Sequence, residues 1–372
     1  MKHILKKIWG GVELTRYKIL ARDSHGALLY RFLIKLLYPI LSSRCILSSR
    51  IINYRNRENK NLYEQVKEAA HNDNLLKKDL VLCYFYYHIV PWEYKLYQFA
   101  SKTHHQRLKY LSDSDRYMCS ELVMGVKIYE ILKDKYQFYN LLKPYYKRPI
   151  LNFSKECSRS ELNDFLSKID EKLFIKPRNG SLGRDTFIVT SLTEKEVLYD
   201  TLSNMKGEWL IEGAIKQSLI MSEWNQSSVN TLRIPSFRFN NQVVILQPFF
   251  RTGRKGQIVD NAGAGGILAV VDAETGIIIT DGHDENLNIF RCHPDSNKQY
   301  KGWQIPCYSE LKTLVKKIHM ELPKDFIYVG FDFALTDKGW DLIEGNWGQF
   351  VGQIATQNGI KTKFDEYIGV FD

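Results

Sequence analysis

Apolar residues recur at intervals of three and four along residues 25–142, which is the spacing of amphipathic helices. Glycine is nearly absent from the second part of this stretch, where Gly125 is the only one between residues 61 and 151. We expect helices over residues 62–70, 92–99 and 117–132, the last with Asp113 or Ser114 as its N-cap. The pattern therefore predicts a mainly helical region over residues 61–130.

Residues 1–60 also contain an amphipathic pattern, and they are strongly basic. Arg31 and Lys35 lie on a different helical face from the apolar positions, and Pro39 is expected to end or kink the helix. The apolar positions are Leu28, Leu29, Phe32, Leu33, Leu36, Leu37 and Ile40. A basic amphipathic helix suits an anionic membrane surface, and it suits equally well a helix packed on the protein body with its basic face in water.

After residue 150 the pattern changes to short runs rich in β-branched and aromatic residues, separated by helices and glycine loops. The predicted strands cover residues 173–176, 186–189, 209–211, 231–239, 243–250, 267–271, 277–280, 328–335 and 340–343. This mixture indicates an α+β or an α/β domain. No uncharged apolar run reaches the roughly 18 residues needed to span a bilayer, and the N-terminus does not read as a signal peptide.

Charge and cysteine content narrow the class of protein. Residues 1–60 hold 13 Lys and Arg against three acids, so this arm accounts for the whole formal net charge of +10. Nucleic acid is an improbable partner, because no recognisable nucleic-acid module accompanies the charge. The six cysteines are scattered, with no C-x-x-C pair, so we expect reduced thiols in a cytosolic protein and no structural zinc.

Two carboxylates lie inside the last two apolar strands. A three-residue turn over residues 337–339 would pair residue 336 with residue 340, and therefore Asp332 with Glu344 on one face. Asn346 shares that face because strand side chains alternate. These hard oxygen donors suit Mg²⁺ held together with nucleotide phosphates. The alternative is a pair of carboxylates bound by arginines at a sheet edge.

A second group of residues suits an anion. A strand ends in Lys176, and a loop containing Gly180 and Gly183 follows it. Glycines let backbone N–H groups approach an anion, and a lysine supplies charge to a phosphate. The loop matches neither common phosphate-binding fingerprint, so an ordinary hairpin turn is the alternative. Residues 208–215, where a strand runs into small residues, are a weaker candidate for a hinge that contacts an adenine edge.

In this order the features resemble the ATP-grasp superfamily, and more closely its sugar-transfer-associated family from bacterial surface-polysaccharide gene clusters. The resemblance covers residue 132 to the C-terminus. It implies an ATP-grasp fold, in which two α+β lobes clasp ATP, preceded by a mainly helical N-terminal region. We therefore expect a basic, partly amphipathic arm over residues 1–60, a helical region over 61–130 and an ATP-grasp catalytic region over 131–372.

The resemblance also implies roles for individual residues. Arg233 and Lys176 resemble catalytic cations, and the implied magnesium ligands are Asp332, Glu344 and Asn346. The implied cofactor-binding residues are Lys135, Lys176, Gly180, Ser181, Gly183, Glu212, Gly213, Ala214, Ile215 and Asn230. Residues 263–266 are expected to close over the acceptor or to form a tight turn. His293 is a candidate substrate contact or a structural residue, and Glu223 is a candidate for the ribose.

The implied activity is that of an ATP-dependent carboxylate–amine ligase, which uses ATP and Mg²⁺ and acts through an acyl phosphate. The resemblance suggests a uronic acid or a related acid in surface-polysaccharide or capsule synthesis as the substrate. The basic arm would then hold the enzyme as a peripheral protein at the cytoplasmic face of the membrane. Two alternatives are a phosphotransferase that acts on a sugar hydroxyl and a non-catalytic scaffold with the same fold.

Overall fold

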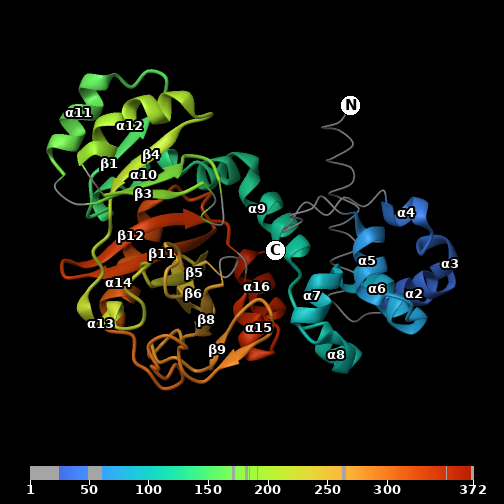
Figure 1. Cartoon of the computed structure of the whole chain (residues 1–372). Helices are drawn as coiled ribbons and strands as arrows, with labels where there is room; N and C mark the ends of the chain where they lie inside the picture. The colour runs from blue at the N-terminus through green and yellow to red at the C-terminus, as the bar shows by residue number, and fades with distance from the viewer. Residues whose placement is uncertain are drawn as a thin grey trace. The chain divides into compact units, whose positions relative to one another are not determined.

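The computed structural model describes residues 25–48, 61–169, 172–180, 183, 185–190, 192–261, 265–348 and 350–369. The chain divides into two compact units (Figure 1). Unit 1 comprises Met1–Val123 and Gln349–Asp372, and unit 2 comprises Met124–Gly348. The C-terminal segment therefore belongs with the N-terminal helices, which differs from the division expected at residues 60 and 130. Of the basic arm, residues 1–24 and 49–60 lie outside the described residues.

Unit 1 is built from helices. They are α2 (His25–Leu36), α3 (Tyr38–Leu41), α4 (Arg44–Ser48), α5 (Leu62–Ala70), α6 (Asn74–Tyr87), α7 (Pro91–Leu96), η1 (Phe99–Ser101), α8 (His104–Arg107), α15 (Gly352–Thr356) and α16 (Lys361–Ile368), together with the first part of α9 (Asp113–Lys133). The helix expected over residues 62–70 has the bounds of α5, which begins in a capping box between Asn61 and Glu64. In α9, Gly125 has φ 79° and interrupts the helical geometry close to the boundary between the units.

Hydrogen bonds explain why the C-terminal segment joins unit 1. The Gln353 amide of α15 accepts from Leu111 N at 3.0 Å and donates to Leu111 O at 3.0 Å. At the start of α16, Lys361 N donates to Lys109 O at 2.9 Å. Each of these bonds satisfies backbone groups of the loop before α9, and unpaired buried backbone groups are costly. Partners 242 or more residues apart therefore close this unit.

Unit 2 contains a small and a large antiparallel sheet. The small sheet has the order β1-β4-β2-β3, with β1 (Ile150–Phe153), β2 (Leu173–Pro177), β3 (Phe187–Val189) and β4 (Trp209–Gly213). Helices α11 (Arg159–Ser167) and α12 (Leu192–Asn204) lie beside it (Figure 1). Their residues Leu162 and Leu198 share one buried core with Ile175 of β2 and Ile211 of β4. Hydrophobic burial therefore fixes this lobe.

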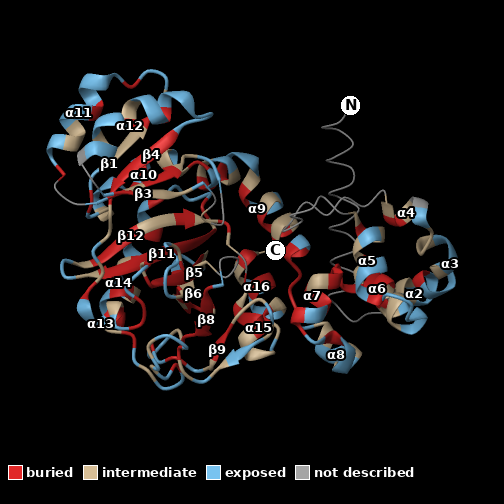
Figure 2. Cartoon of the chain, viewed as in Figure 1, coloured by how far each residue is buried: buried red, intermediate tan, exposed pale blue. Residues whose placement is uncertain are grey.

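The large sheet has the order β10-β9-β8-β7-β5-β11-β12, with β6 paired to β5. Its strands are β5 (Thr231–Phe239), β6 (Gln242–Ile245), β7 (Phe249–Thr252), β8 (Ile267–Val270), β9 (Gly282–His283), β10 (Ile289–Phe290), β11 (Tyr328–Thr336) and β12 (Gly339–Asn346). The central strands are buried (Figure 2). The other described elements of unit 2 are α10 (Lys135–Leu142), η2 (Lys143–Tyr145), α13 (Leu219–Ser222) and α14 (Tyr308–Glu321).

The strand predictions missed the two-residue strands β9 and β10, and they fail at three further places for local reasons. The single strand expected over residues 243–250 is two strands, because Gln247 has φ 52° and Pro248 follows it. The strand expected over residues 277–280 forms only isolated bridges. The sequence pattern gave no indication of β1, whose four residues are too short a run to show alternation.

The β11–β12 hairpin confirms one predicted pair and corrects another. Asp332 pairs with Glu344 as expected, but Thr336 pairs with Gly339 rather than with residue 340. The turn is therefore one residue shorter than predicted, and a register shift between Asp332 and Phe333 restores the pairing. Such a bulge inserts one extra residue into one strand. Two deviations of one residue cancel, and the two carboxylates still lie opposite each other.

Helix α10 packs so closely on β12 that the position of Gly345 has no room for a side chain. A Cβ atom on Gly345 would lie 2.1 Å from Cζ of Phe138, which is buried. Glycine is therefore required at this point for the helix to pack on the strand. Lys135 is the first residue of α10, and this packing places it near the end of β12. Glu344 lies at that end, and its negative charge interacts with Lys135.

A buried arginine links the two sheets of unit 2. Arg148, just before β1, donates through Nε to Glu212 Oε2 of β4 at 2.9 Å. Its Nη1 donates to Asp341 Oδ1 of β12 at 2.9 Å and to Leu342 O at 2.9 Å. The side chains of all three ionic residues are at most 5% exposed. Burial alone would lower the pKa of Arg148, but Glu212 and Asp341 outweigh it and raise that pKa.

Replacing this arginine tests the link. Arg148→Met leaves Glu212 and Asp341 without their shared cation, so we expect the free energy of unfolding to fall by about 3–5 kcal/mol. Urea denaturation followed by fluorescence measures it. The control is Arg159→Met, which removes a pair with Asp200 whose side chains are at least half exposed, and there we expect a loss below about 1 kcal/mol. Equal losses in both variants would contradict the structural role of Arg148.

Candidate active site

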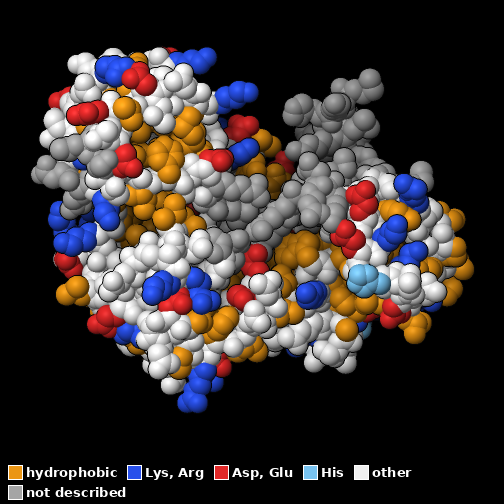
Figure 3. Space-filling model, in the orientation of Figure 1, with side chains coloured by type: hydrophobic (Ala, Val, Ile, Leu, Met, Phe, Trp, Pro, Cys, Tyr) orange, Lys and Arg blue, Asp and Glu red, His pale blue; other side chains and the backbone are white. Residues whose placement is uncertain are grey.

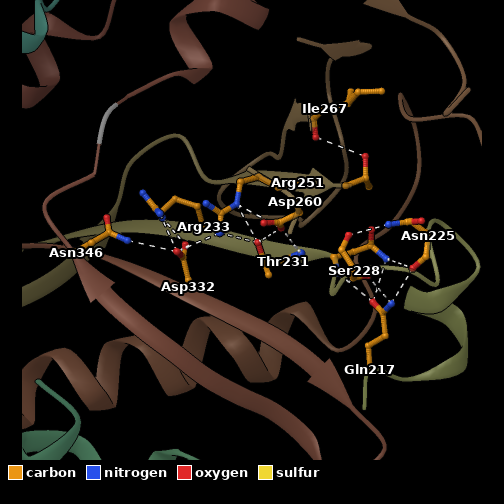
Figure 4. A network of polar contacts seen from close by, with 12 residues as sticks. Gln217, Asn225, Ser228, Thr231, Arg233, Arg251, Asp260, Ile267, Asp332 and Asn346 are labelled. Atoms are coloured by element: carbon orange, nitrogen blue, oxygen red, sulfur yellow. Dashed lines mark hydrogen bonds and ion pairs between the residues drawn. The ribbon is translucent and has the colours of Figure 1, made fainter. Parts of the chain in front are cut away.

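The site begins with a carboxylate held by two arginines on adjacent strands. Asp332 of β11 lies opposite Arg233 of β5 in the sheet register. Arg233 donates through Nε and Nη2 to the two oxygens of Asp332, the second bond measuring 2.7 Å. Arg251 of β7 brings its Nη2 to 3.0 Å from Asp332 Oδ2 (Figure 4). Burial alone would raise the pKa of Asp332, but the two guanidinium groups outweigh it and lower that pKa.

Arg251 also links this carboxylate to a second buried acid. Its Nε and Nη2 donate to Thr231 Oγ1 at 2.9 and 2.7 Å, and its Nε lies 3.6 Å from Asp260 Oδ2. Asp260 accepts from the backbone N of Thr231 at 3.1 Å. Burial raises the pKa of Asp260 in spite of Arg251 and Thr231 nearby. Two arginines and two acids thus form one continuous charged network on this face of the sheet (Figure 4).

The three predicted metal ligands come together at the end of this network. The amide of Asn346 donates to Asp332 Oδ2 at 3.3 Å. Its Oδ1 is buried and has no hydrogen-bond partner in the described part of the chain. Glu344 is partly buried, and its charge acts on Arg233 and on Lys135. The alternative foreseen for the carboxylates, arginine pairing, therefore applies to Asp332, while Glu344 makes no ion pair with another described residue.

This donor set fits a magnesium ion. Carboxylate and amide oxygens are the ligands that hard cations prefer, and the unpartnered Asn346 Oδ1 is the kind of buried atom that a ligand would satisfy. No three His, Cys, Asp or Glu side chains gather as a metal cluster among the described residues. The proposed set instead combines the two carboxylates of Asp332 and Glu344 with one amide.

The two predicted phosphate lysines lie near each other, and Lys135 also lies near Glu344. Lys176, at the end of β2, places Nζ 2.7 Å from Glu212 Oε1 of β4, and both side chains are buried. Lys135 donates through Nζ to Gly180 O at 2.8 Å and to Pro177 O at 3.3 Å. Burial lowers the pKa of Lys135, and Lys176 adds to this, while Glu344 and Glu212 oppose it. The lysines thus concentrate positive charge beside the glycine loop.

The predicted hinge follows directly from Glu212. The pKa of the Glu212 carboxyl would rise through burial alone, but Arg148 and Lys176 outweigh burial and lower it. The next two backbone N–H groups are already used, since Gly213 N donates to Pro149 O and Ala214 N to Lys172 O. Among the described residues, none hydrogen-bonds to the backbone of Ile215. This backbone segment can therefore offer hydrogen-bonding groups to a flat heterocycle.

Asn230 lies in a separate hydrogen-bond network. It is fully buried, and its Nδ2 contacts Gln217 Oε1, Met221 O and Asn225 O at 2.9 to 3.0 Å. The Gln217 amide in turn donates to the carbonyls of Asn225 and Ser228 (Figure 4). These hydrogen bonds stabilise the segment that connects β4 and β5. They favour a structural role for Asn230 over the predicted contact with a cofactor.

The remaining predicted residues lie in different environments. Gly183 has φ 64°, and a Cβ there would lie 3.0 Å from Val259 Cγ1, so glycine suits the position. His293 is fully buried, with Nε2 on Gly253 O and Nδ1 accepting from two backbone N–H groups, an arrangement typical of a structural histidine. Glu223 is exposed and pairs with Lys298, which leaves the ribose contact unassigned. Ser181 and residues 262–264 lie outside the described residues.

Sequence reasoning missed four charged residues of this region. Arg148 and Asp341 join the sheets, and Arg251 and Asp260 extend the network around Asp332. No short motif marks them, because their partners lie far away in the chain, 193 residues in the case of Arg148 and Asp341. Arg251 and Asp341 could have been found from the sequence, because each is a charged residue within an apolar strand and a buried charge needs a partner.

The architecture is that of an α+β protein with two sheets, and comparison with known proteins gives the family. Residues 120–367 match the family described as sugar-transfer associated ATP-grasp. That match covers more than half of the chain. The chain therefore belongs to the sugar-transfer associated ATP-grasp family and has the ATP-grasp fold, as the motifs predicted.

Solved structures with a similar arrangement are remote. N5-carboxyaminoimidazole synthetase from Staphylococcus aureus, complexed with ADP, has 14% identity and a TM-score of 0.40, and the match covers 64% of this chain and 52% of that chain. D-alanine–D-alanine ligase from Bacillus anthracis has 16% identity and a TM-score of 0.39, with 70% and 73% covered. D-alanyl-alanine synthetase A from Vibrio cholerae has 13% identity and a TM-score of 0.40, with 65% and 66% covered. The search among curated proteins found no match. At these scores the likeness carries no argument about substrates.

The role of Asn230 can be tested through stability. Asn230→Ala removes the donor to three buried oxygens, so we expect the free energy of unfolding to fall by about 1–3 kcal/mol. The control is Asn204→Ala, at an exposed helical position, with an expected change within about 0.5 kcal/mol. Chemical denaturation of both variants measures the difference. An unchanged stability for Asn230→Ala, combined with a loss of nucleotide affinity, would instead support the cofactor contact.

Proposed function

We propose that this protein is an ATP-dependent carboxylate–amine ligase that activates its acid as an acyl phosphate. The observation that carries the proposal is the arrangement around Asp332. There a buried carboxylate held by two arginines lies beside Glu344, which forms no ion pair with another described residue, and beside the Asn346 Oδ1 atom, which has no hydrogen-bond partner among them. Membership of the sugar-transfer associated ATP-grasp family supports the same chemistry.

The nucleotide is proposed to lie along the small sheet. Lys135 and Lys176 supply charge for its phosphates, and the loop with Gly180 and Gly183 supplies backbone groups near them. Gly213 and Ala214 already use their N–H groups, so the backbone groups of Ile215 are proposed to contact the adenine, and Glu212 keeps Lys176 in place through the 2.7 Å ion pair. Catalysis of this kind depends mainly on positioning and on charge neutralisation, and it requires no covalent nucleophile.

Asp332, Glu344 and Asn346 would hold magnesium. When bound, Mg²⁺ neutralises the charge of the β- and γ-phosphates and orients the transferred phosphoryl group. Arg233 and Arg251 present guanidinium groups that can stabilise negative charge on the transferred group and on the acyl phosphate. Because both arginines already lie fixed by Asp332, little reorganisation is needed when that charge develops.

The substrate class is proposed from the family. We propose a uronic acid or a related carboxylate of a surface glycan, joined to an amino compound in polysaccharide synthesis. The description of the family as sugar-transfer associated supports a sugar acid. We also propose that this acid is carried on a lipid and that the enzyme works at the cytoplasmic face of the membrane. Among the described residues, no helix has the length and apolarity needed to cross a bilayer.

The proposed chemistry is tested by trapping the activated acid. Protein, Mg²⁺-ATP and a pool of uronic acids are incubated with hydroxylamine, and we expect a hydroxamate and ADP in equal amounts. Glu344→Gln removes one metal-binding charge, so we expect the rate to fall by about 10²–10³, the size of effect typical for one electrostatic contact in a site. Glu310→Gln, at an exposed position of α14, serves as the matched control and keeps the full rate.

Other outcomes would redirect the proposal. A stable phosphosugar with ADP release and no hydroxamate would indicate a phosphotransferase. An intact fold that binds no nucleotide would indicate the scaffold. Equal rates in Glu344→Gln and in the unchanged protein would contradict the metal site proposed at β12.

A further inference from the structure

Helix α2 turns its more hydrophobic face away from the protein. Its exposed positions include Phe32 at 63%, Leu36 at 66% and Leu29 at 59%, and the exposed row continues through α3 to Ile40 at 61%. The whole set, which we name the α2 face, consists of Leu28, Leu29, Phe32, Leu33, Leu36, Leu37 and Ile40. Single exposed apolar residues are ordinary, but contiguous patches on one helix indicate a binding surface.

The opposite side of α2 makes the contacts within unit 1. Ala27 and Ile34 are buried, and they are seven residues apart, which places them on one helical side. On the same side, Tyr30 Oη donates to Phe85 O of α6 at 3.3 Å, and Tyr86 Oη donates to Arg31 O at 3.0 Å. The helix thus packs through Ala27, Ile34 and Tyr30, while its leucines and Phe32 are exposed. The sequence left open whether the helix lies in a membrane interface or packs on the body, and the structure places the apolar side outward.

Basic residues accompany the α2 face. Lys35 is exposed and lies between the apolar residues of the α2 face in the sequence. Arg44, at the start of α4, is also exposed. α2 and α3 contain no acidic residue, and residues 1–60 as a whole hold 13 basic residues against three acids. Hydrophobic side chains together with Lys and Arg appear at the edge of the molecule where α2 and α3 lie (Figure 3). The charge of this surface complements an anionic partner.

We propose that the α2 face is a docking surface for an anionic phospholipid membrane, with the helix lying in the interface rather than crossing it. Leucine and phenylalanine side chains would enter the boundary between headgroups and acyl chains, while Lys35 and Arg44 contact lipid phosphates. At 12 residues α2 is too short to span a bilayer, which needs about 20 residues. The proposal deepens the proposed membrane location of the ligase by naming the surface that makes the contact.

Charge complementarity favours a membrane over a protein partner as the occupant. A contact between two copies of this chain would bring Lys35 and Arg44 of both copies near each other, and like charges at an interface oppose association. An anionic bilayer supplies negative charge along the whole surface and accommodates side chains of any shape. The α2 face consists of seven exposed apolar residues and fits that kind of contact.

The test is co-sedimentation of the full chain with phosphatidylcholine vesicles that contain or lack phosphatidylglycerol, without ATP. We expect binding only to the anionic vesicles. Phe32→Glu and Leu29→Glu change exposed side chains, so the fold should survive, which circular dichroism checks. Each should weaken vesicle binding by about tenfold or more, because a buried leucine or phenylalanine contributes strongly to partitioning. Lys35→Glu should weaken binding to anionic vesicles in the same direction.

Leu219→Glu is the matched control, because Leu219 of α13 is 80% exposed and lies outside the α2 face. It should bind vesicles like the unchanged protein. Absence of binding by the unchanged protein, or equal binding by Phe32→Glu, would overturn the proposal. So would self-association in sedimentation velocity that Phe32→Glu abolishes without any vesicle binding, since the face would then join two copies. Because no nucleotide turnover is measured, the proposed ligase activity and this docking surface can fail separately.

Discussion

The buried cation Arg148 is the constraint on which unit 2 depends. It is shared by Glu212 in the small sheet and Asp341 in the large sheet, and Glu212 in turn holds Lys176. Two cations and two anions thus balance in a region nearly closed to water. Removing charges from water costs several kcal/mol per ion, so such a group persists only when every member is paired. The same contacts that join the sheets fix a lysine where a phosphate would bind.

The second group of charges follows from strand alternation. Arg233, Arg251 and Asp332 come from the adjacent strands β5, β7 and β11, and the antiparallel register places them on one face. Asp332 forms ion pairs with both arginines. Glu344 and Asn346, from the neighbouring strand β12, add oxygen donors at the end of the row. The site therefore comes from the register of four strands rather than from mobile loops, which suits a reaction that depends on positioning.

The sequence allowed the fold and much of the candidate site to be predicted where the prediction depended on local patterns, and it failed where it depended on contacts between distant residues. The pairing of Asp332 with Glu344 was correct although the turn was one residue too long, because a bulge compensates. The alternation of side chains along a strand and the positions of glycines in turns are local properties, so they are visible in the sequence. Arg148 and Arg251 were missed, because their roles depend on partners brought together by the fold. Amphipathicity also showed that α2 has an apolar side, but only the packing shows that this side faces outward.

The central claim is that Asp332, Glu344 and Asn346 bind a divalent cation together with a nucleotide. The most direct measurement is electron paramagnetic resonance of Mn²⁺, a magnesium substitute with similar oxygen ligands, titrated with and without ATP. The account predicts that tight Mn²⁺ binding requires ATP in the unchanged protein and in Glu310→Gln, and that Glu344→Gln weakens it. Nucleotide-independent Mn²⁺ binding, or the same ATP-dependent binding in Glu344→Gln, would contradict it.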